Sequence, residues 1–158
     1  MKTFADSSAL VKLYADEVGH EVVRQLEVLV VSHLARVEVP AALWRKHRMG
    51  ELTAQDTSVL MSEFEADWYG AGDELPRFSA VALTTGVLER ASQFCASHGL
   101  RAHDAVQLSC AVAARSADES CRYFAGFDEA LSAAAAAEGF ELVAWDRLRP
   151  RSVKSSGK

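Results

Sequence analysis

The sequence lacks long apolar runs, paired cysteines and the histidine spacings of zinc sites. No apolar run approaches the roughly 18 residues of a membrane-spanning helix. Asp6 stands where a secretory signal peptide carries its apolar stretch, so we expect a cytoplasmic protein that does not act on membranes. The three cysteines, Cys95, Cys110 and Cys121, form no CxxC pair, which is typical of a reducing compartment. We expect Cys95 and Cys110 in the core.

The chain also lacks an overall positive charge. Its 158 residues include 17 basic and 22 acidic side chains, for a net charge of −5. Five of the basic residues lie in 147–158, which holds no acid, so residues 1–146 carry 12 basic against 22 acidic groups, a balance of −10. Any role with nucleic acid must therefore depend on local basic patches, metal ions or the terminal segment.

Length and composition fit one globular domain. We predict a single domain over 1–146 and a basic, flexible tail over 147–158, because the tail is polar and contains Pro and Gly. The tail is either a solubilising end, which we favour, or a binding arm.

Short apolar segments alternate with helical patterns along the chain. Strands are expected at 2–5, 28–31, 78–83, 122–127 and 141–145. Helices are expected near 9–14, 21–27, 33–49, 54–68, 85–98, 102–116 and 131–138, the first capped by Ser7 or Ser8. This alternation predicts an α/β fold with a mostly parallel sheet.

Four acids stand out by their positions. Asp6 and Asp128 follow predicted strands, and ligands of open parallel sheets bind beyond the carboxyl ends of strands. Glu38 and Asp104 lie in apolar helical surroundings, where an unpaired carboxylate is costly. Four carboxylates at one crevice would raise one another's pKa, and a divalent cation would relieve that repulsion. Oxygen ligands alone favour Mg²⁺ or Mn²⁺.

Each acid also has a local alternative. Asp6 and Asp128 could each cap the helix that follows, and Asp104 could face the dipole of its own helix. Glu38 could pair with an arginine of its own helix. The four functional roles depend on one another, however, because one fold would bring all four acids together. The combination therefore outweighs each local role.

Four stretches, in this order, resemble the motifs of PIN-domain ribonucleases, especially the VapC toxins of bacterial toxin–antitoxin pairs. They are residues 4–14 (FADSSALVKLY), 31–43 (VSHLARVEVPAAL), 99–108 (GLRAHDAVQL) and 127–139 (FDEALSAAAAAEG). The resemblance covers nearly the whole chain. It implies a three-layer α/β/α domain with a mostly parallel central sheet, and a metal-dependent endoribonuclease.

The resemblance also implies residue roles. Asp6, Glu38 and Asp104 would be the catalytic acids and Asp128 a fourth, more variable one. Asp6 and Asp104 would bind one or two Mg²⁺ or Mn²⁺ ions directly. Ser8 matches a small hydroxyl residue that steadies the acidic cluster in the family.

An acidic pocket that acts on polyanionic RNA needs basic groups at its rim. Arg45, Lys46 and Arg48 follow Glu38 on the same predicted helix, either as RNA contacts or as a solvated helix end. The implied substrate is a tRNA, rRNA or mRNA, whose cleavage would inhibit translation. The resemblance further implies a cognate antitoxin protein and a homodimer.

Other functions stay open at this point. One alternative is a non-catalytic RNA- or protein-binding module of the same fold, and another is a DNA-directed nuclease. A phosphatase of the haloacid-dehalogenase type is disfavoured, because no Asp-x-Asp follows the first strand. His103 is either an exposed helix residue or an RNA contact, and Asp146 is a weaker candidate for an outer carboxylate.

Overall fold

The computed structural model describes residues 1–144. Their centre is a five-stranded sheet in the order β3-β2-β1-β4-β5, and every neighbouring pair is parallel. The strands are β1 (Lys2–Ala5), β2 (Val28–Ser32), β3 (Phe78–Val81), β4 (Cys121–Ala125) and β5 (Glu141–Leu142). The predicted α/β class with a parallel sheet is confirmed.

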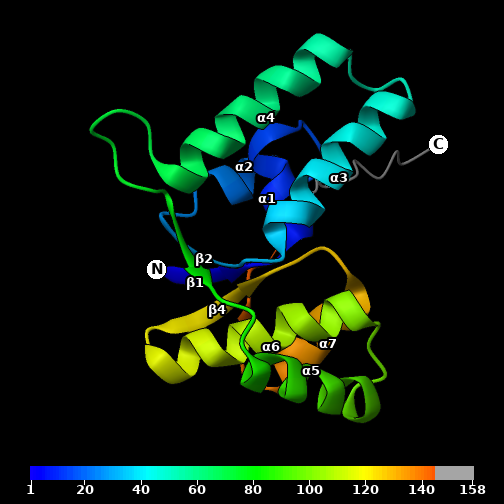
Figure 1. Cartoon of the computed structure of the whole chain (residues 1–158). Coiled ribbons are helices and arrows are strands. Elements are labelled where there is room, and N and C mark those ends of the chain that lie inside the picture. Colours follow the sequence, from blue (N-terminus) through cyan, green and yellow to red (C-terminus); the bar gives the residue numbers. More distant parts are fainter. Residues whose placement is uncertain (145–158) are drawn as a thin grey trace, which may run out of the picture.

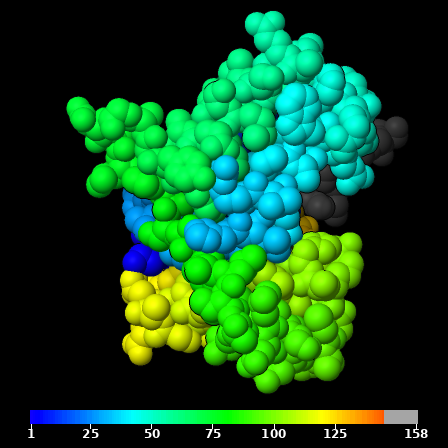
Figure 2. Space-filling view, in the orientation of Figure 1, coloured from blue at the N-terminus to red at the C-terminus, as the bar shows by residue number. Residues whose placement is uncertain are grey.

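Helices cover both faces of this sheet (Figure 1). They are α1 (Ser7–Tyr14), α2 (His20–Arg24), α3 (Ala35–Arg48), α4 (Ala54–Tyr69), α5 (Thr85–Ser97), α6 (Ala102–Ala117) and α7 (Glu129–Ala137). Helices α1 to α4 lie on one face, and α5 to α7 lie on the other. Figure 2 shows α3 and α4 over the upper part of the surface and α5 and α6 over the lower part. The fold is therefore the predicted three-layer α/β/α arrangement.

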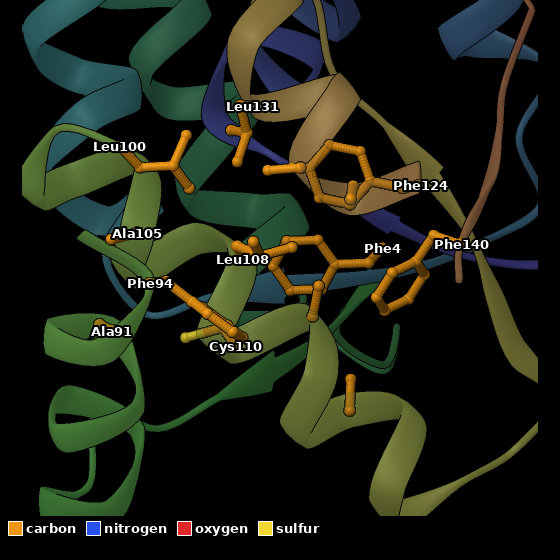
Figure 3. Packing of buried hydrophobic residues seen from close by; sticks show 14 of the residues in the cluster. Phe4, Ala91, Phe94, Leu100, Ala105, Leu108, Cys110, Phe124, Leu131 and Phe140 are labelled. Atoms are coloured by element: carbon orange, nitrogen blue, oxygen red, sulfur yellow. The ribbon is translucent and has the colours of Figure 1, made fainter. Parts of the chain in front are cut away.

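Each face of the sheet has its own apolar core, because successive strand residues point to opposite faces. Phe4 of β1 stacks on Phe124 of β4 at 5.8 Å between ring centroids, and Leu108 of α6 packs into the same cluster (Figure 3). The next residue, Ala5, belongs to the opposite core with Phe64 of α4. The central strands are thus buried on both sides, as their apolar sequences predict.

Several sequence-based boundaries were wrong by a few residues. Asp6, rather than Ser7 or Ser8, is the N-cap of α1, and β4 ends at Ala125 instead of reaching residue 127. Cys110 is buried as predicted, but Cys95 is exposed, because it lies on the outer face of α5. The predicted tail 147–158 and Asp146 lie outside the described residues. Among residues 1–144, no helix combines the length and apolarity that crossing a membrane requires.

The strand order places a crevice at the centre of the sheet. β1 is the middle strand, and the chain continues to β2 on one side of it and pairs with β4 on the other. At such a switch point the loops beyond the carboxyl ends of the two strands diverge. Residues directly after β1 and β4 are therefore brought to one place.

Candidate active site

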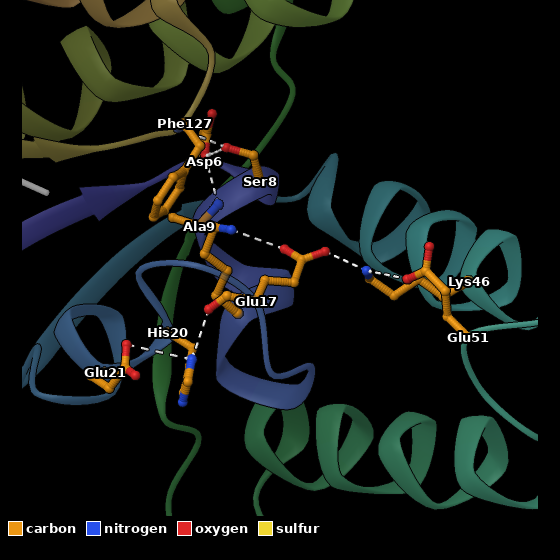
Figure 4. A network of polar contacts seen from close by, with 10 residues as sticks. Asp6, Ser8, Ala9, Glu17, His20, Glu21, Lys46, Glu51 and Phe127 are labelled. Atoms are coloured by element: carbon orange, nitrogen blue, oxygen red, sulfur yellow. Dashed lines mark hydrogen bonds and ion pairs between the residues drawn. The ribbon is translucent and has the colours of Figure 1, made fainter. Parts of the chain in front are cut away.

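Asp6 lies directly after β1 and is fixed by both strands and by α1. Its backbone N–H donates to the Ala125 carbonyl at 3.0 Å. Its Oδ1 accepts hydrogen bonds from the Ala9 N–H at 2.9 Å and from the Ser8 hydroxyl at 2.7 Å (Figure 4). The Ser8 Oγ in turn accepts from the Phe127 N–H at 3.0 Å. Asp6 is thus a helix cap and also a member of the crevice, and Ser8 ties it to the loop after β4.

The environment of Asp6 opposes its ionisation. Burial raises the pKa of the Asp6 carboxyl to about 7, and the charges of Glu38 and Asp104 add to this, against the hydrogen bonds from Ser8 and Ala9. The other carboxylate oxygen has a close neighbour. A Cβ at Gly126 would lie 2.9 Å from Asp6 Oδ2 and 2.8 Å from Phe124 Cε1, so a residue without a side chain is required there.

Glu38 lies on α3 and reaches a partner on α6. Its Oε2 accepts a hydrogen bond from the Gln107 amide at 3.1 Å, while its Oε1 is buried without a hydrogen-bond partner among the described residues. The alternative of a pair with an arginine of the same helix was wrong. Arg36 bonds Glu65 instead, and no ion pair joins Glu38 to Arg45 within residues 1–144.

Asp104 and Asp128 share one basic partner, the side chain of Arg101. Asp104 lies in the first turn of α6 and is 7 % exposed, and Asp128 caps α7 by accepting from the Leu131 N–H at 2.8 Å. The Arg101 guanidinium lies 3.1 Å from Asp104 Oδ2 and 3.5 Å from Asp128 Oδ2. Asp104 therefore does lie in the first turn of its helix and Asp128 does cap the helix that follows it, and both acids also lie beside the same arginine.

All four acids line one cavity of about 880 Å³. Its walls also include the other residues singled out from the sequence: Ser8, Arg45, Lys46, Arg48 and His103. The fold thus brings together every candidate site residue that lies within the described part of the chain.

The basic rim is not uniform. Arg45 and Arg48 are exposed on α3, whereas the Lys46 ammonium is held between Glu17 and Glu51 (Figure 4). Lys12 of α1 bonds the same Glu17 at 2.9 Å. Burial alone would raise the pKa of Glu17. The hydrogen bonds from Lys46 and Lys12 outweigh that effect and hold this pKa below its usual value. Lys46 therefore already serves a structural network, while both arginines face solvent.

Comparison with known proteins identifies the family. Residues 3–137, which contain all four acids, match the PIN domain family. Ribonuclease VapC45 and ribonuclease VapC49, from two strains of Mycobacterium tuberculosis, are each 33 % identical over 114 residues, which is 70 % of this chain and 74 % of theirs. This chain belongs to the VapC ribonucleases of the PIN domain family.

Solved structures share the VapC fold. Mycobacterium tuberculosis VapC20, a toxin that cleaves the sarcin-ricin loop, superposes with a TM-score of 0.58 at 15 % identity, over 84 % of this chain and 94 % of its own. PAE2754 from Pyrobaculum aerophilum gives a TM-score of 0.50 at 20 % identity, over 84 % and 78 %. At these identities the two structures support the fold alone.

The acids of this VapC chain suit a divalent cation in kind. They are hard oxygen donors around one cavity, and Glu38 Oε1 is a buried acceptor with no donor among residues 1–144. As the side chains stand, no three acidic, histidine or cysteine residues in the described part of the chain are close enough to hold an ion. Asp104 is instead held by Arg101.

Three residues with evident roles were not found from the sequence. Each is only one letter of a longer motif in the sequence, yet Arg101, Gln107 and Lys12 each contact a charged group in or beside the cavity. A signal existed for two of them. Arg101 and Gln107 lie three residues before and three residues after Asp104, and on a helix that spacing places side chains next to one another.

Proposed function

We propose that this chain is a Mg²⁺- or Mn²⁺-dependent endoribonuclease that hydrolyses RNA phosphodiester bonds as the toxin of a toxin–antitoxin pair and thereby inhibits translation. The observation that carries the proposal is the convergence of Asp6, Glu38, Asp104 and Asp128 on one cavity. Membership of the VapC ribonucleases supports the same reaction.

Asp6 and Asp104 would hold the cation, and Glu38 and Asp128 would complete its surroundings. When bound, a divalent cation supplies positive charge that offsets the carboxylates and stabilises the charge that develops on the phosphate. The chain itself fixes the acids. Ser8 and the Ala9 N–H orient Asp6, and Gly126 leaves room for its second oxygen.

The basic rim would bind the flanking phosphates of the RNA. Arg45 and Arg48 are suited to this, because they line the cavity and face solvent. Lys46 is a third candidate whose ammonium would have to exchange Glu17 or Glu51 for a phosphate. An acidic body with a cavity of this kind also complements a basic segment of an antitoxin protein.

The reaction is tested by incubating total cellular RNA with the purified protein and Mn²⁺ or Mg²⁺, with EDTA as a parallel arm. We expect discrete fragments that require the cation and that disappear with Asp6→Asn or Asp104→Asn. Asp73→Asn is the matched control, because Asp73 is an exposed acid that does not line the cavity. Matched DNA and RNA oligonucleotides then separate a ribonuclease from a DNA-directed nuclease.

Fragments that persist in both site variants would refute the assigned site. RNA binding without any cleavage would favour the non-catalytic module of the same fold instead. Co-expression with the protein encoded by the adjacent gene tests the antitoxin, since a cognate partner should co-purify and suppress cleavage. Light scattering at micromolar concentrations tests the proposed homodimer, and a clean monomer would contradict it.

A further inference from the structure

Gln107 is a buried polar residue at the meeting point of three helices. It lies on α6, one turn after Asp104, and is 2 % exposed. Its amide Nε2 donates to the Ser7 Oγ of α1 at 2.9 Å and to Glu38 Oε2 of α3 at 3.1 Å. One side chain therefore connects the helix that Asp6 begins, the helix that carries Glu38 and the helix that carries Asp104.

The chemistry of its partners fixes how the Gln107 amide is oriented. An ionised carboxylate accepts hydrogen bonds and cannot donate them, so the amide nitrogen must face Glu38. Ser7, which is 7 % exposed, accepts from the same nitrogen and holds it from the other side. The carboxylate of Glu38 is thereby located relative to α1 by an amide with two anchors.

Two acceptors beside this contact have no donor. Gln107 Oε1 and Glu38 Oε1 are both buried without a hydrogen-bond partner among the described residues, and both residues line the cavity. Burying an unpaired acceptor is costly, and Thr3 Oγ1 in β1 is a third buried oxygen in this state among the described residues. Unlike Thr3, Glu38 and Gln107 line the cavity, so a cation bound there would offset part of that cost.

We propose that Gln107 is a positioning residue for the cation site: it fixes the Glu38 carboxylate at the wall of the cavity that Asp6 and Asp104 also line. The identity of the ligand, a divalent cation, rests on the proposed function. The hydrogen bond between Gln107 and Glu38 does not depend on that proposal. Removing a partner that orients the groups around a metal ion lowers metal affinity or activity by about 10–100-fold.

The test compares Gln107→Met, Gln107→His and wild type by calorimetric titration with Mn²⁺ in the absence of RNA, at pH ~8 where a histidine ring is neutral. Methionine keeps the length of the side chain and removes the donor, so we expect a loss of Mn²⁺ affinity of about 10–100-fold. A neutral histidine can present an N–H to Glu38, and we expect it to restore part of the loss.

Controls separate positioning from folding. Gln93→Met is the matched substitution, because Gln93 is exposed on α5 and does not line the cavity. It should leave Mn²⁺ affinity unchanged. Urea unfolding of each variant without metal reports stability, and a merely structural role for Gln107 would lower that stability while leaving the affinity of the folded protein unaltered. If Gln107→Met does not fold, Ser7→Ala, which removes one anchor, takes its place and should weaken Mn²⁺ binding.

The outcomes distinguish this inference from the proposed function. Equal Mn²⁺ affinity of wild type and Gln107→Met, within about twofold, would overturn the positioning role even if RNA is cleaved. A wild-type protein that binds Mn²⁺ but cleaves no RNA would overturn the ribonuclease proposal, and the affinities would still decide on Gln107. Failure of the wild type to bind Mn²⁺ would overturn both.

Discussion

Replacing Asp6 with Asn should change how the stability of the metal-free protein depends on pH. The pKa of Asp6 is about 7 in the folded protein, because the carboxyl is buried, against 3.8 for the unperturbed group. A folded-state pKa above the unfolded value means that the folded protein binds this proton more tightly. The contribution of Asp6 to stability is thus fully present below pH ~4 and is lost as the pH rises through ~7.

The magnitude follows from the two pKa values. About three units correspond to a cost of at most about 4 kcal/mol above pH ~7, and the part lost between pH ~5 and pH ~8 is about 2.5 kcal/mol. Asn does not titrate, and its oxygen can still accept from Ser8 and Ala9. The unfolding free energy of Asp6→Asn minus that of wild type should therefore rise by about 2.5 kcal/mol over this range.

Urea unfolding in EDTA at several pH values measures this difference directly. Subtracting the two proteins removes the titration of the groups that do not interact with Asp6. A difference that stays constant from pH ~5 to pH ~8 would show that burial does not raise the pKa of Asp6, and the electrostatic reasoning would fail. Asp73→Asn is the matched control, because Asp73 is an exposed acid outside the cavity.

Three further predictions concern the wall, the rim and the core. Gly126→Ala should destabilise the protein by about 1–3 kcal/mol and slow RNA cleavage by about tenfold or more, because the new Cβ would lie 2.8 Å from Phe124 Cε1 and 2.9 Å from Asp6 Oδ2; urea unfolding and initial rates measure these effects. Arg45→Ala with Arg48→Ala should reduce the slope of log affinity for RNA against log salt by about one per arginine, and an unchanged slope would remove both from the interface. Leu108→Ala should cost about 2–5 kcal/mol in unfolding free energy, because Leu108 is fully buried; a loss below about 1 kcal/mol would contradict its place in the core.

The fold could be predicted because buried parallel strands have a distinctive sequence. The apolar run at 28–31 and the alternation of such runs with helical patterns indicate a doubly covered sheet. Details at the ends of elements could not be predicted as well. Cys95 follows buried Phe94 on α5, and only the packing of that helix decides which of two adjacent residues faces outward.

The positions of the acids in the candidate site could also be predicted from the sequence. Asp6 and Asp128 could be located because each follows a strand, and strand order brings their loops together. The hydrogen-bond partners of the acids could not be predicted from the sequence. Glu38 is bonded by Gln107, which is 69 residues away in the sequence, and local spacing offered only an arginine of the same helix. Contacts between helices depend on how the layers pack, which periodicity alone does not encode.

Each of the four acids would cost free energy if its carboxylate were buried without a partner. Arg101 compensates Asp104 and Asp128, and Asp6 receives hydrogen bonds at only one of its two oxygens among the described residues. Burial above all, with the charges of Glu38 and Asp104 adding to it, keeps the ionised form of Asp6 unfavourable, and a ligand at about 100 times its dissociation constant would contribute about 2.7 kcal/mol of stability. That gain is of the same order as the cost of ionising Asp6. The corner between β1 and α1 holds Asp6 in place despite that cost, because Ser8 and the Ala9 N–H fix one oxygen of its carboxyl group.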